Sequence, residues 1–579
     1  MLHRISTPIL VAILLYHGYQ YYQDQNLRKS VQNYASMRNK EQPKTDHSAK
    51  MITPGVHKVN EEIYVAVGYA LGNSIMLIGD DGVVIIDTTE SLAKGKIIAE
   101  AFRNITDKPV KGVIYTHNHL DHVVGTESFL NVLNGSKDVE IWAHHTFLDI
   151  YFQSTARVGK AHAVRAFHQF GVFLDDDFIS GGIGVRLTID KNLNFVFQPP
   201  NRVLRQSRQT IQIAGMSLDL IHVPGETDDT ICVYWPKHEA LLGTDNLYEA
   251  FPNLYAIRGT PFRSLKQWYE SLDTMRALEP EYFVMSHHMP LIGKKLVANQ
   301  MRIYRDAVQL VHDQTVRYIN QNLHPDDIAS RIKLPKHVQG NAYLQEIYGT
   351  VKWSSKGLFA GYMGWFSGDI TELDPLLPME RAERIVKLAG GLDNIAKEAS
   401  KALEDNDPQW ALFLADSAHK VFPNDQKVKE VKSKALIDMS NRQTSHNGYN
   451  YYRTVSLTTL GKATVKSSDK SKKAIINSCS IPQLFHLLSL RFKAEDESCA
   501  TMDKMVKFIF PDVKQEIRFH VRNGVVDLSG LQFREEDDLK VTVDSIVWRA
   551  LMTGEWKTSI LAEPSIFDLK ELMGCFERD

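Results

Sequence analysis

The sequence contains little cysteine and almost no net charge. Only four cysteines occur in 579 residues, and none of them forms a C-x-x-C pair. This excludes a cysteine-rich zinc module and a small disulfide-stapled scaffold. The 67 Lys and Arg residues nearly balance the 69 Asp and Glu residues, which leaves a net charge of −2. Because the whole chain has no basic excess, we expect no nucleic-acid partner.

The sequence also lacks a long apolar run near its start. Residues 1–23 contain no acidic residue, and Arg4 precedes the eight-residue apolar run Ile9–Tyr16. A membrane-spanning helix needs about 20 such residues, so the run suits the core of a signal peptide better. We expect 1–23 to be a signal peptide or signal anchor, in a protein that is secreted or associated with the membrane through its N-terminus. A mitochondrial presequence and an ordinary apolar helix are the alternatives, and residues 24–58 resemble a polar linker.

Short β-branched runs alternate with helical patterns from about residue 59. Ile75–Ile78 and Val83–Ile86 flank a Gly-Asp-Asp-Gly turn, and a helix is expected over Ser91–Ile105. The order of strands and helices predicts an α/β layer fold up to about residue 300. Later strands are expected at Glu140–Ala143, Met216–Val223, Ile231–Trp235, Ala240–Leu242 and Tyr282–Met285.

The second half of the chain changes character twice. Apolar residues at spacings of three and four predict helices at 382–388, 392–403 and 410–421. Residues 436–470 are rich in Ser, Thr, Asn and Lys and indicate a linker. After about residue 475, alternating apolar residues lead to Asn523-Gly524, which is typical of a β-hairpin in a small α+β domain.

The segment Thr116-His-Asn-His-Leu-Asp-His122 follows a predicted strand and supplies four potential metal ligands. Imidazole and carboxylate groups are good ligands for zinc and related divalent ions. His117 and His119 can converge on one ion from a loop, whereas Asp121 and His122 can face a second. The alternative is a polar loop whose histidines cap a helix, but four such side chains at this spacing favour a metal site.

The His-x-His-x-Asp-His motif resembles the signature of the metallo-β-lactamase fold. Asn73–Asp87 is similar to the opening hairpin of that fold. The resemblance implies an αββα sandwich whose remaining ligands follow later strands. Three candidates lie in the right order: Glu226 after Val-Pro-Gly, Asp245 after Leu-Gly-Thr, and His287 after Ser286.

Glu226 stands where many members of the fold carry histidine, and in this it resembles the alkylsulfatase branch. Asn253–Gly259, the segment from Tyr348 to Pro375, and Phe508–Asp512 with Asn523–Val526 resemble further parts of that branch. The implied order is a metallo-β-lactamase-like catalytic domain at 59–320, an all-α dimerisation domain at 321–440, a linker at 441–474 and a small α+β sterol-carrier-like domain at 475–579. A homodimer is therefore expected.

The resemblance also implies a binuclear site with two Zn²⁺. The first ion would be held by His117, His119 and Glu226, the second by Asp121, His122 and His287, with Asp245 between them. Relatives carry glutamate at the position of Asp245. Asn253 and Arg258 would bind the sulfate group, and Asp121 and Arg258 would take part in catalysis. His288 is a candidate proton donor, and the alternative is a histidine that only packs or faces solvent. Asp87 either orients a ligand histidine or caps a turn.

The implied reaction is hydrolysis of linear primary alkyl sulfate esters to alcohol and inorganic sulfate by metal-activated water. The substrate would be an amphiphilic alkyl sulfate. One alternative is another hydrolase of the same fold, acting on a thiolester, a lactone or an aryl sulfate. The other is a lipid-binding scaffold with a degenerate metal site.

Overall fold

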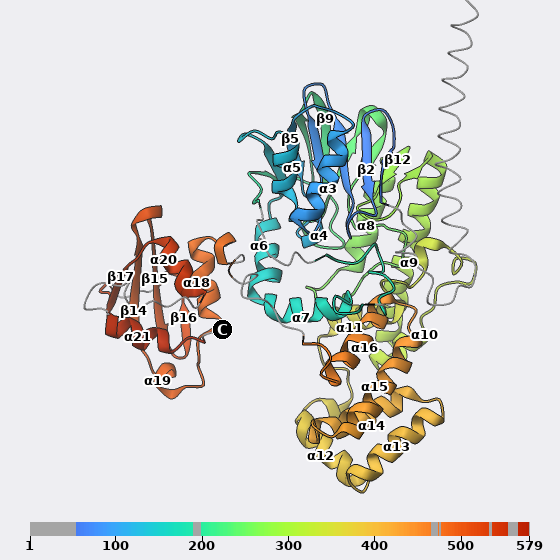
Figure 1. The fold of residues 1–579 in the computed structure, drawn as a ribbon, viewed down its shortest axis with the longest axis vertical. Coiled ribbons are helices and arrows are strands. Elements are labelled where there is room, and N and C mark those ends of the chain that lie inside the picture. The colour runs from blue at the N-terminus through green and yellow to red at the C-terminus, as the bar shows by residue number, and fades with distance from the viewer. Residues whose placement is uncertain are drawn as a thin grey trace, which may run out of the picture.

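The computed structural model describes residues 54–175, 177–188, 198–464, 473, 476–531, 535–553 and 566–577. The predicted signal segment lies outside these residues. None of the helices described there is both long enough and apolar enough to cross a membrane. Figure 1 shows three parts: a sandwich coloured blue to green, a helical region coloured yellow to orange, and a separate red domain at the C-terminal end.

Two sheets form the sandwich. The order in the first is β1-β2-β3-β4-β5-β6-β7, and in the second it is β13-β12-β11-β10-β9-β8. The strands of the first sheet are β1 Gly55–Lys58, β2 Ile63–Val67, β3 Ser74–Ile78, β4 Val83–Ile86, β5 Val110–Ile114, β6 Glu140–His144 and β7 Arg202–Leu204. Those of the second are β8 Arg208–Ile213, β9 Met216–His222, β10 Ile231–Trp235, β11 Ala240–Leu242, β12 Tyr282–Val284 and β13 Leu291–Ile292.

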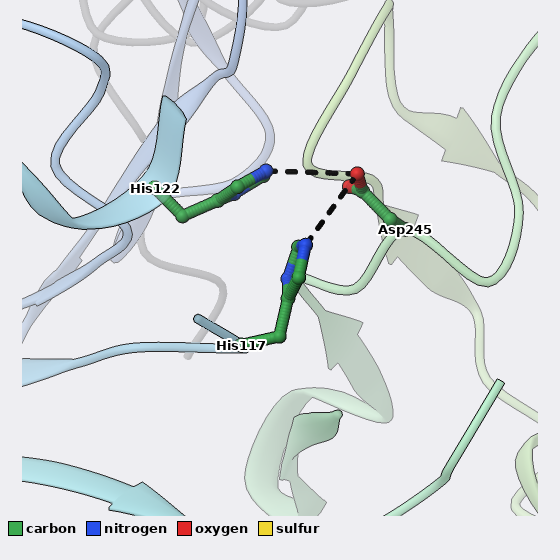
Figure 2. A group of neighbouring side chains, drawn as sticks. All are labelled: His117, His122 and Asp245. Carbon is green, nitrogen blue, oxygen red and sulfur yellow. Dashed lines mark ion pairs between the residues drawn. The ribbon is translucent and has the colours of Figure 1, made fainter. Parts of the chain in front are cut away.

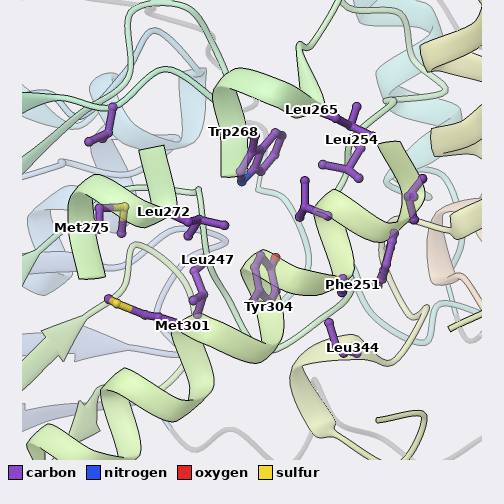
Figure 3. Packing of buried hydrophobic residues seen from close by; sticks show 14 of the residues in the cluster. Leu247, Phe251, Leu254, Leu265, Trp268, Leu272, Met275, Met301, Tyr304 and Leu344 are labelled. Atoms are coloured by element: carbon purple, nitrogen blue, oxygen red, sulfur yellow. The ribbon is translucent and has the colours of Figure 1, made fainter. Parts of the chain in front are cut away.

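Apolar side chains fill the space between the sheets and the space outside each of them. Strand β4 is buried at all four residues because other layers cover both of its faces. Helices α3 (Leu92–Arg103) and α5 (Thr126–Val132) contribute to the core on the first sheet, and α8 (Leu265–Arg276) and α9 (Lys294–Ile319) to the core on the second. Figure 3 shows Trp268 of α8 and Tyr304 of α9 in that second core. The αββα sandwich implied by the resemblance is confirmed.

The predicted strands and helices of this half agree with the structure to within two residues at their ends. The β3–β4 hairpin pairs Ile78 with Val83 around the predicted turn. Four short helices complete the sandwich domain and its edge: α4 Leu120–Val123, α6 Phe147–Phe152, the π-helix Gln153–Arg157 and α7 Gly159–Gln169. In Figure 1, α7 runs between the sandwich and the helical region.

The helical region extends further than predicted. Its helices are α10 Pro325–Arg331, α11 Val351–Met363, α12 Pro378–Leu388, α13 Leu392–Glu404, α14 Pro408–Val421, α15 Gln426–Asn441 and α16 His446–Thr459. The linker predicted for 441–474 is therefore wrong over α16. This helix is rich in polar residues, but Asn447, Asn450 and Thr454 are buried, and Ser456 hydrogen-bonds Ser433 of α15 at 2.7 Å.

The C-terminal part is a small α+β domain, as predicted. Its elements are α18 Ile481–Ser489, α19 Glu497–Ala500, β14 Lys504–Phe510, β15 Gln515–Arg522, β16 Val525–Asp527, β17 Leu539–Thr542, α20 Ser545–Met552 and α21 Ile566–Gly574. Asn523 and Gly524 both have positive φ angles and form the predicted hairpin turn between β15 and β16. A disulfide joins Cys499 to Cys575, a pairing that the sequence did not reveal.

Candidate metal centre

The candidate site lies at the carboxyl ends of strands from both sheets. His117 follows β5, Glu226 follows β9, Asp245 follows β11 and His287 follows β12. The backbone N–H of Ile231 donates to the carbonyl of Thr116 at 2.8 Å, which joins the two sheets beside the site. Strand ends that are far apart in the chain therefore meet at one edge of the sandwich.

Backbone strain is concentrated at these strand ends. Asp87, Thr244 and His288 have φ angles of 59°, 92° and 67°. Positive φ is unfavourable for residues other than glycine, and especially for β-branched Thr244, so the packing around them must hold these conformations. Gly243 has a φ of 77°, and a Cβ there would lie 2.6 Å from a Thr116 methyl carbon. The residue before Thr244 must therefore be glycine.

The structure brings all seven predicted ligands together. Figure 2 shows His117 and His122 pointing toward Asp245. The donor atoms form three groups, in each of which they lie within 4.8 Å of one another. These groups are His117 with His122 and Asp245, Asp121 with His122 and His287, and His119 with Glu226 and Asp245.

Asp245 connects these groups. Its Oδ2 lies 3.1 Å from Nε2 of His287, 3.5 Å from Nε2 of His122 and 3.8 Å from Nε2 of His117. Although aspartate is shorter than the glutamate expected in relatives, Asp245 therefore reaches His117, predicted for the first ion, as well as His122 and His287, predicted for the second.

Asp87 orients His122. Its Oδ2 accepts a hydrogen bond from His122 Nδ1 at 2.8 Å, and its Oδ1 accepts one from the Thr116 N–H at 2.8 Å. With Nδ1 occupied in this way, Nε2 of His122 faces Asp121 and Asp245. The structure thus gives Asp87 the orienting contact, together with a bond that holds the ligand loop.

Glu226 is held by an arginine that the sequence reading missed. Its Oε1 lies 2.8 Å from Nη1 of Arg263, and both side chains are buried. Asn246 accepts a hydrogen bond from the Glu226 N–H at 2.9 Å and so positions its backbone. Arg263 stands five residues after Arg258, just outside the segment Asn253–Gly259, and this nearness in the sequence was the one signal for it.

The charges of the site are strongly perturbed. Burial lowers the pKa of His117 to about 4 and raises that of Glu226 to about 7. Burial opposes charge on His122 as well, but the carboxylates of Asp121 and Asp245 raise its pKa well above its usual value. Burial would raise the pKa of Asp121, yet His122 lowers it to about 2. Without a cation, therefore, part of the site is balanced by protons.

The donor set fits a bound divalent cation. Nε2 of His122, Oε2 of Glu226 and Oδ1 of Asp245 are buried and have no hydrogen-bond partner within the described part of the chain. Unpartnered buried polar atoms are costly, and a cation would satisfy them. Imidazole nitrogens and carboxylate oxygens are also the ligands that zinc accepts.

Arg258 lies at the edge of the ligand groups. Its side chain is buried, and Nη2 donates to Nε2 of His119 at 3.2 Å, whereas Nη1 has no hydrogen-bond partner among the described residues. Asn253, five residues before Arg258, is also buried, and its Nδ2 has no hydrogen-bond partner among the described residues. Both predicted substrate-binding residues thus carry a buried donor without a hydrogen-bond partner among the described residues, and their binding role stays a prediction.

His288 differs from the other predicted site residues because it belongs to none of the three donor groups. Its Nδ1 accepts a hydrogen bond from the Glu249 N–H at 3.1 Å. In the neutral ring the proton is then on Nε2. Its role as a proton donor stays a prediction.

We expect Arg263→Met to destabilise the metal-free protein more at pH 8 than at pH 6. The variant leaves the Glu226 carboxylate buried without its partner, and breaking a buried pair costs about 3–5 kcal/mol. Because burial raises the pKa of Glu226 to about 7, the carboxyl is mostly neutral at pH 6 and tolerates the loss. Thermal unfolding at the two pH values measures the difference. Arg208→Met is the control. It breaks the ion pair between Arg208 and Asp219, and the Arg208 side chain is half exposed, so its loss should cost little.

Comparison with known proteins gives the family. Residues 68–287 match the model of the metallo-beta-lactamase superfamily, and residues 324–460 match that of alkyl sulfatase dimerisation. A linear primary-alkylsulfatase from a Pseudomonas strain is 32% identical over 523 residues, which cover 87% of this chain and 98% of the relative. The chain belongs to the alkylsulfatase family.

Other alkylsulfatases agree over most of the chain. An alkyl/aryl-sulfatase of Saccharomyces cerevisiae is 24% identical and covers 86% of this chain and 76% of its own length. The solved structure of the stereoselective inverting sec-alkylsulfatase Pisa1 from Pseudomonas sp. superposes with a TM-score of 0.83 at 21% identity, over 91% of this chain and 85% of that one. At that identity the superposition shows a shared fold.

Proposed function

We propose that this alkylsulfatase homologue hydrolyses linear primary alkyl sulfate esters to an alcohol and inorganic sulfate. The observation that carries the proposal is the meeting of seven metal-binding side chains beside the buried guanidinium of Arg258. The relative that is 32% identical bears the name of this activity. A guanidinium matches the oxyanion geometry of a sulfate group, which supports a sulfate ester over a thiolester or a lactone.

We also propose that the site holds two Zn²⁺ ions. His117, His119 and Glu226 would bind one, Asp121, His122 and His287 the other, and Asp245 would contact both. When bound, the ions would polarise sulfate oxygens and lower the pKa of a water molecule. Asp87 holds His122 in its orientation, Arg258 and Asn253 would bind the sulfate group, and His288 would give a proton to the leaving alcohol.

A substrate panel tests the activity. The purified, zinc-loaded protein is assayed with dodecyl sulfate, a secondary alkyl sulfate, an aryl sulfate, a thiolester and a lactone, with metal content measured in the same samples. We expect sulfate release to be fastest from dodecyl sulfate. Turnover of the thiolester or lactone in place of all sulfate esters would assign another activity of the fold. Lack of bound metal and of turnover would favour the lipid-binding alternative.

We expect the affinity for zinc to fall as the pH falls. The metal-free site carries protons on Glu226 and His122. Burial raises the pKa of Glu226 to about 7. Burial lowers the pKa of His122, but the carboxylates of Asp121 and Asp245 outweigh it and raise that pKa well above its usual value. Zinc must displace these protons, which costs about tenfold in affinity per pH unit for each proton. Competition with a chromophoric chelator at pH 6, 7 and 8 measures the slope. A pH-independent affinity would contradict the protonated site.

We propose a homodimer formed through the region that matches alkyl sulfatase dimerisation. Exposed apolar side chains gather there after α11, and Trp365 and Ile370 are each 74% exposed. Such a group of apolar residues is unusual on a monomer surface. Sedimentation of the double variant Trp365→Glu, Ile370→Glu tests this, because a dimer through this surface dissociates in the variant. An unchanged dimer would place the interface elsewhere.

We propose secretory export, with a mitochondrial location as the alternative. The apolar run near the N-terminus and the Cys499–Cys575 disulfide both support it, because disulfides persist in oxidising compartments. Peptide mapping of the protein from its native host tests the proposal. A disulfide-linked peptide and a trimmed or membrane-retained N-terminus are expected. Reduced cysteines in a cytosolic fraction would oppose export.

A further inference from the structure

One face of helix α7 holds the backbone of the loop that carries Arg258. His162, Arg165 and Gln169 are spaced three and four residues apart and so share one face of the helix. Nη2 of Arg165 donates to the carbonyl of Ile257 at 2.8 Å, and Oε1 of Gln169 accepts from the N–H of Arg258 at 3.0 Å. The Ile257 carbonyl and the Arg258 N–H belong to the same peptide group, so helix α7 binds both polar atoms of that group.

His162 binds the next part of the loop. Its Nε2 lies 2.6 Å from the carbonyl oxygen of Gly259, which can only accept, so Nε2 donates. Gly259 has a φ of 102°, a conformation that favours glycine. The backbone on both sides of the Arg258 Cα is thus bound to α7.

The position of the Arg258 guanidinium depends on this backbone. The guanidinium contacts His119 at 3.2 Å, and its other terminal nitrogen is buried and has no hydrogen-bond partner among the described residues. A hydrogen bond weakens steeply when its distance or angle departs from the ideal, so a displaced guanidinium would bind the sulfate group less tightly. A helix that fixes the loop can therefore control the affinity for the sulfate group without touching the substrate.

Helix α7 is itself anchored to the helical region. Nδ2 of Asn450, a buried residue of α16, donates to the carbonyl of Gln169 at 3.3 Å. Gln169 is fully buried, and the two helices lie side by side below the sandwich in Figure 1. The loop of Arg258 is therefore connected through α7 to the region that matches alkyl sulfatase dimerisation.

We propose that His162, Arg165 and Gln169 are positioning residues that act on sulfate esters through Arg258. The inference rests on the proposed function, since it concerns the binding of the same substrate. Loss of one contact shifts Arg258 and weakens binding, whereas the metal ligands keep their geometry. The expected signature is a higher KM with kcat and metal content nearly unchanged.

The test uses Gln169→Leu, which removes the acceptor, and Gln169→Glu, which keeps it. We expect Gln169→Leu to raise KM for dodecyl sulfate about tenfold and Gln169→Glu to restore most of the loss. Arg165→Ala is the second variant, because Arg165 is exposed and its loss leaves the core intact. His168→Ala is the matched control, since this histidine of α7 contacts Val164 of its own helix and Tyr451 of α16.

A double-mutant cycle separates positioning from a general structural role. In an Arg258→Ala background, Gln169→Leu and Arg165→Ala should have no further effect on KM, because the group they act through is gone. The same tenfold loss in both backgrounds would overturn the inference. Unchanged KM values for both variants in an active protein would also overturn the inference. If the wild type releases sulfate from no ester, the proposed function is overturned instead.

Inorganic sulfate gives a readout without turnover. We expect its dissociation constant, measured by calorimetry on the zinc-loaded protein, to rise in Gln169→Leu and Arg165→Ala by the same factor as KM. The His168→Ala control should bind sulfate like the wild type. Equal sulfate affinity in all four proteins would contradict a positioning role for α7.

Discussion

Asp245→Asn is expected to lower sulfate release from dodecyl sulfate by at least about a thousandfold and to reduce the bound zinc. Oδ2 of Asp245 lies within 3.8 Å of three ligand histidines, so one substitution weakens both halves of the site. Asparagine keeps the shape but loses the negative charge that would offset the cations of the proposed binuclear site. Metal analysis after dialysis and steady-state kinetics measure the two effects.

Two further variants sharpen this expectation. Asp245→Glu keeps the charge and introduces the residue that the resemblance places at this position in relatives, so it should retain more metal and activity than Asp245→Asn. Asp219→Asn is the control, because this aspartate binds Arg208 and Thr210 away from the ligand groups. Full zinc content and full activity in Asp245→Asn would show that Asp245 is not shared between two ions.

Arg258→Ala is expected to lower kcat/KM for alkyl sulfates about a hundredfold or more while the zinc content stays unchanged. A charged, nearly buried guanidinium is a strong partner for a sulfate oxyanion, and charge-assisted hydrogen bonds of this kind are about twice as strong as neutral ones. Arg258→Lys should recover only part of the loss, because an ammonium group lacks the planar fork. Steady-state kinetics with parallel metal analysis measures both quantities.

Arg302→Ala is the matched control for Arg258. Arg302 lies on the exposed side of α9, where it donates to Asn299, and its removal should leave the kinetics unchanged. If Arg258→Ala also loses zinc, the arginine supports His119 as a ligand rather than the substrate. If KM and kcat both stay at wild-type values, Arg258 does not bind the sulfate group.

Local patterns were sufficient for most of the fold. The β3–β4 hairpin and the Asn523-Gly524 turn were predicted correctly because each depends on a few neighbouring residues whose backbone preferences are strong. Helix α16 was missed because its Asn, Ser and Thr residues have the composition of a loop. Packing against α15 buries those polar groups, and their hydrogen bonds then stabilise a helix that composition alone disfavours.

The site shows the same division between local and distant information. The ligands of residues 117–122 stand in one segment, so their spacing alone indicated a metal. Arg263 is 37 residues from its partner Glu226, and Gln169 is 89 residues from Arg258. The Cys499–Cys575 disulfide spans 76 residues. No spacing rule connects such pairs, because folding and not the order of residues brings them together.

The amino-acid sequence by itself determined the α/β class and the metal-binding chemistry, because these depend on residue types at short spacing. The αββα sandwich followed from the family resemblance that those residues carry. The tertiary structure alone decided that Asp245 reaches both halves of the site, that Arg263 holds Glu226 and that α7 holds the loop of Arg258. Those arrangements depend on strand ends and helices from distant segments meeting in space. Their geometry is set by the packing of the whole sandwich against the helical region.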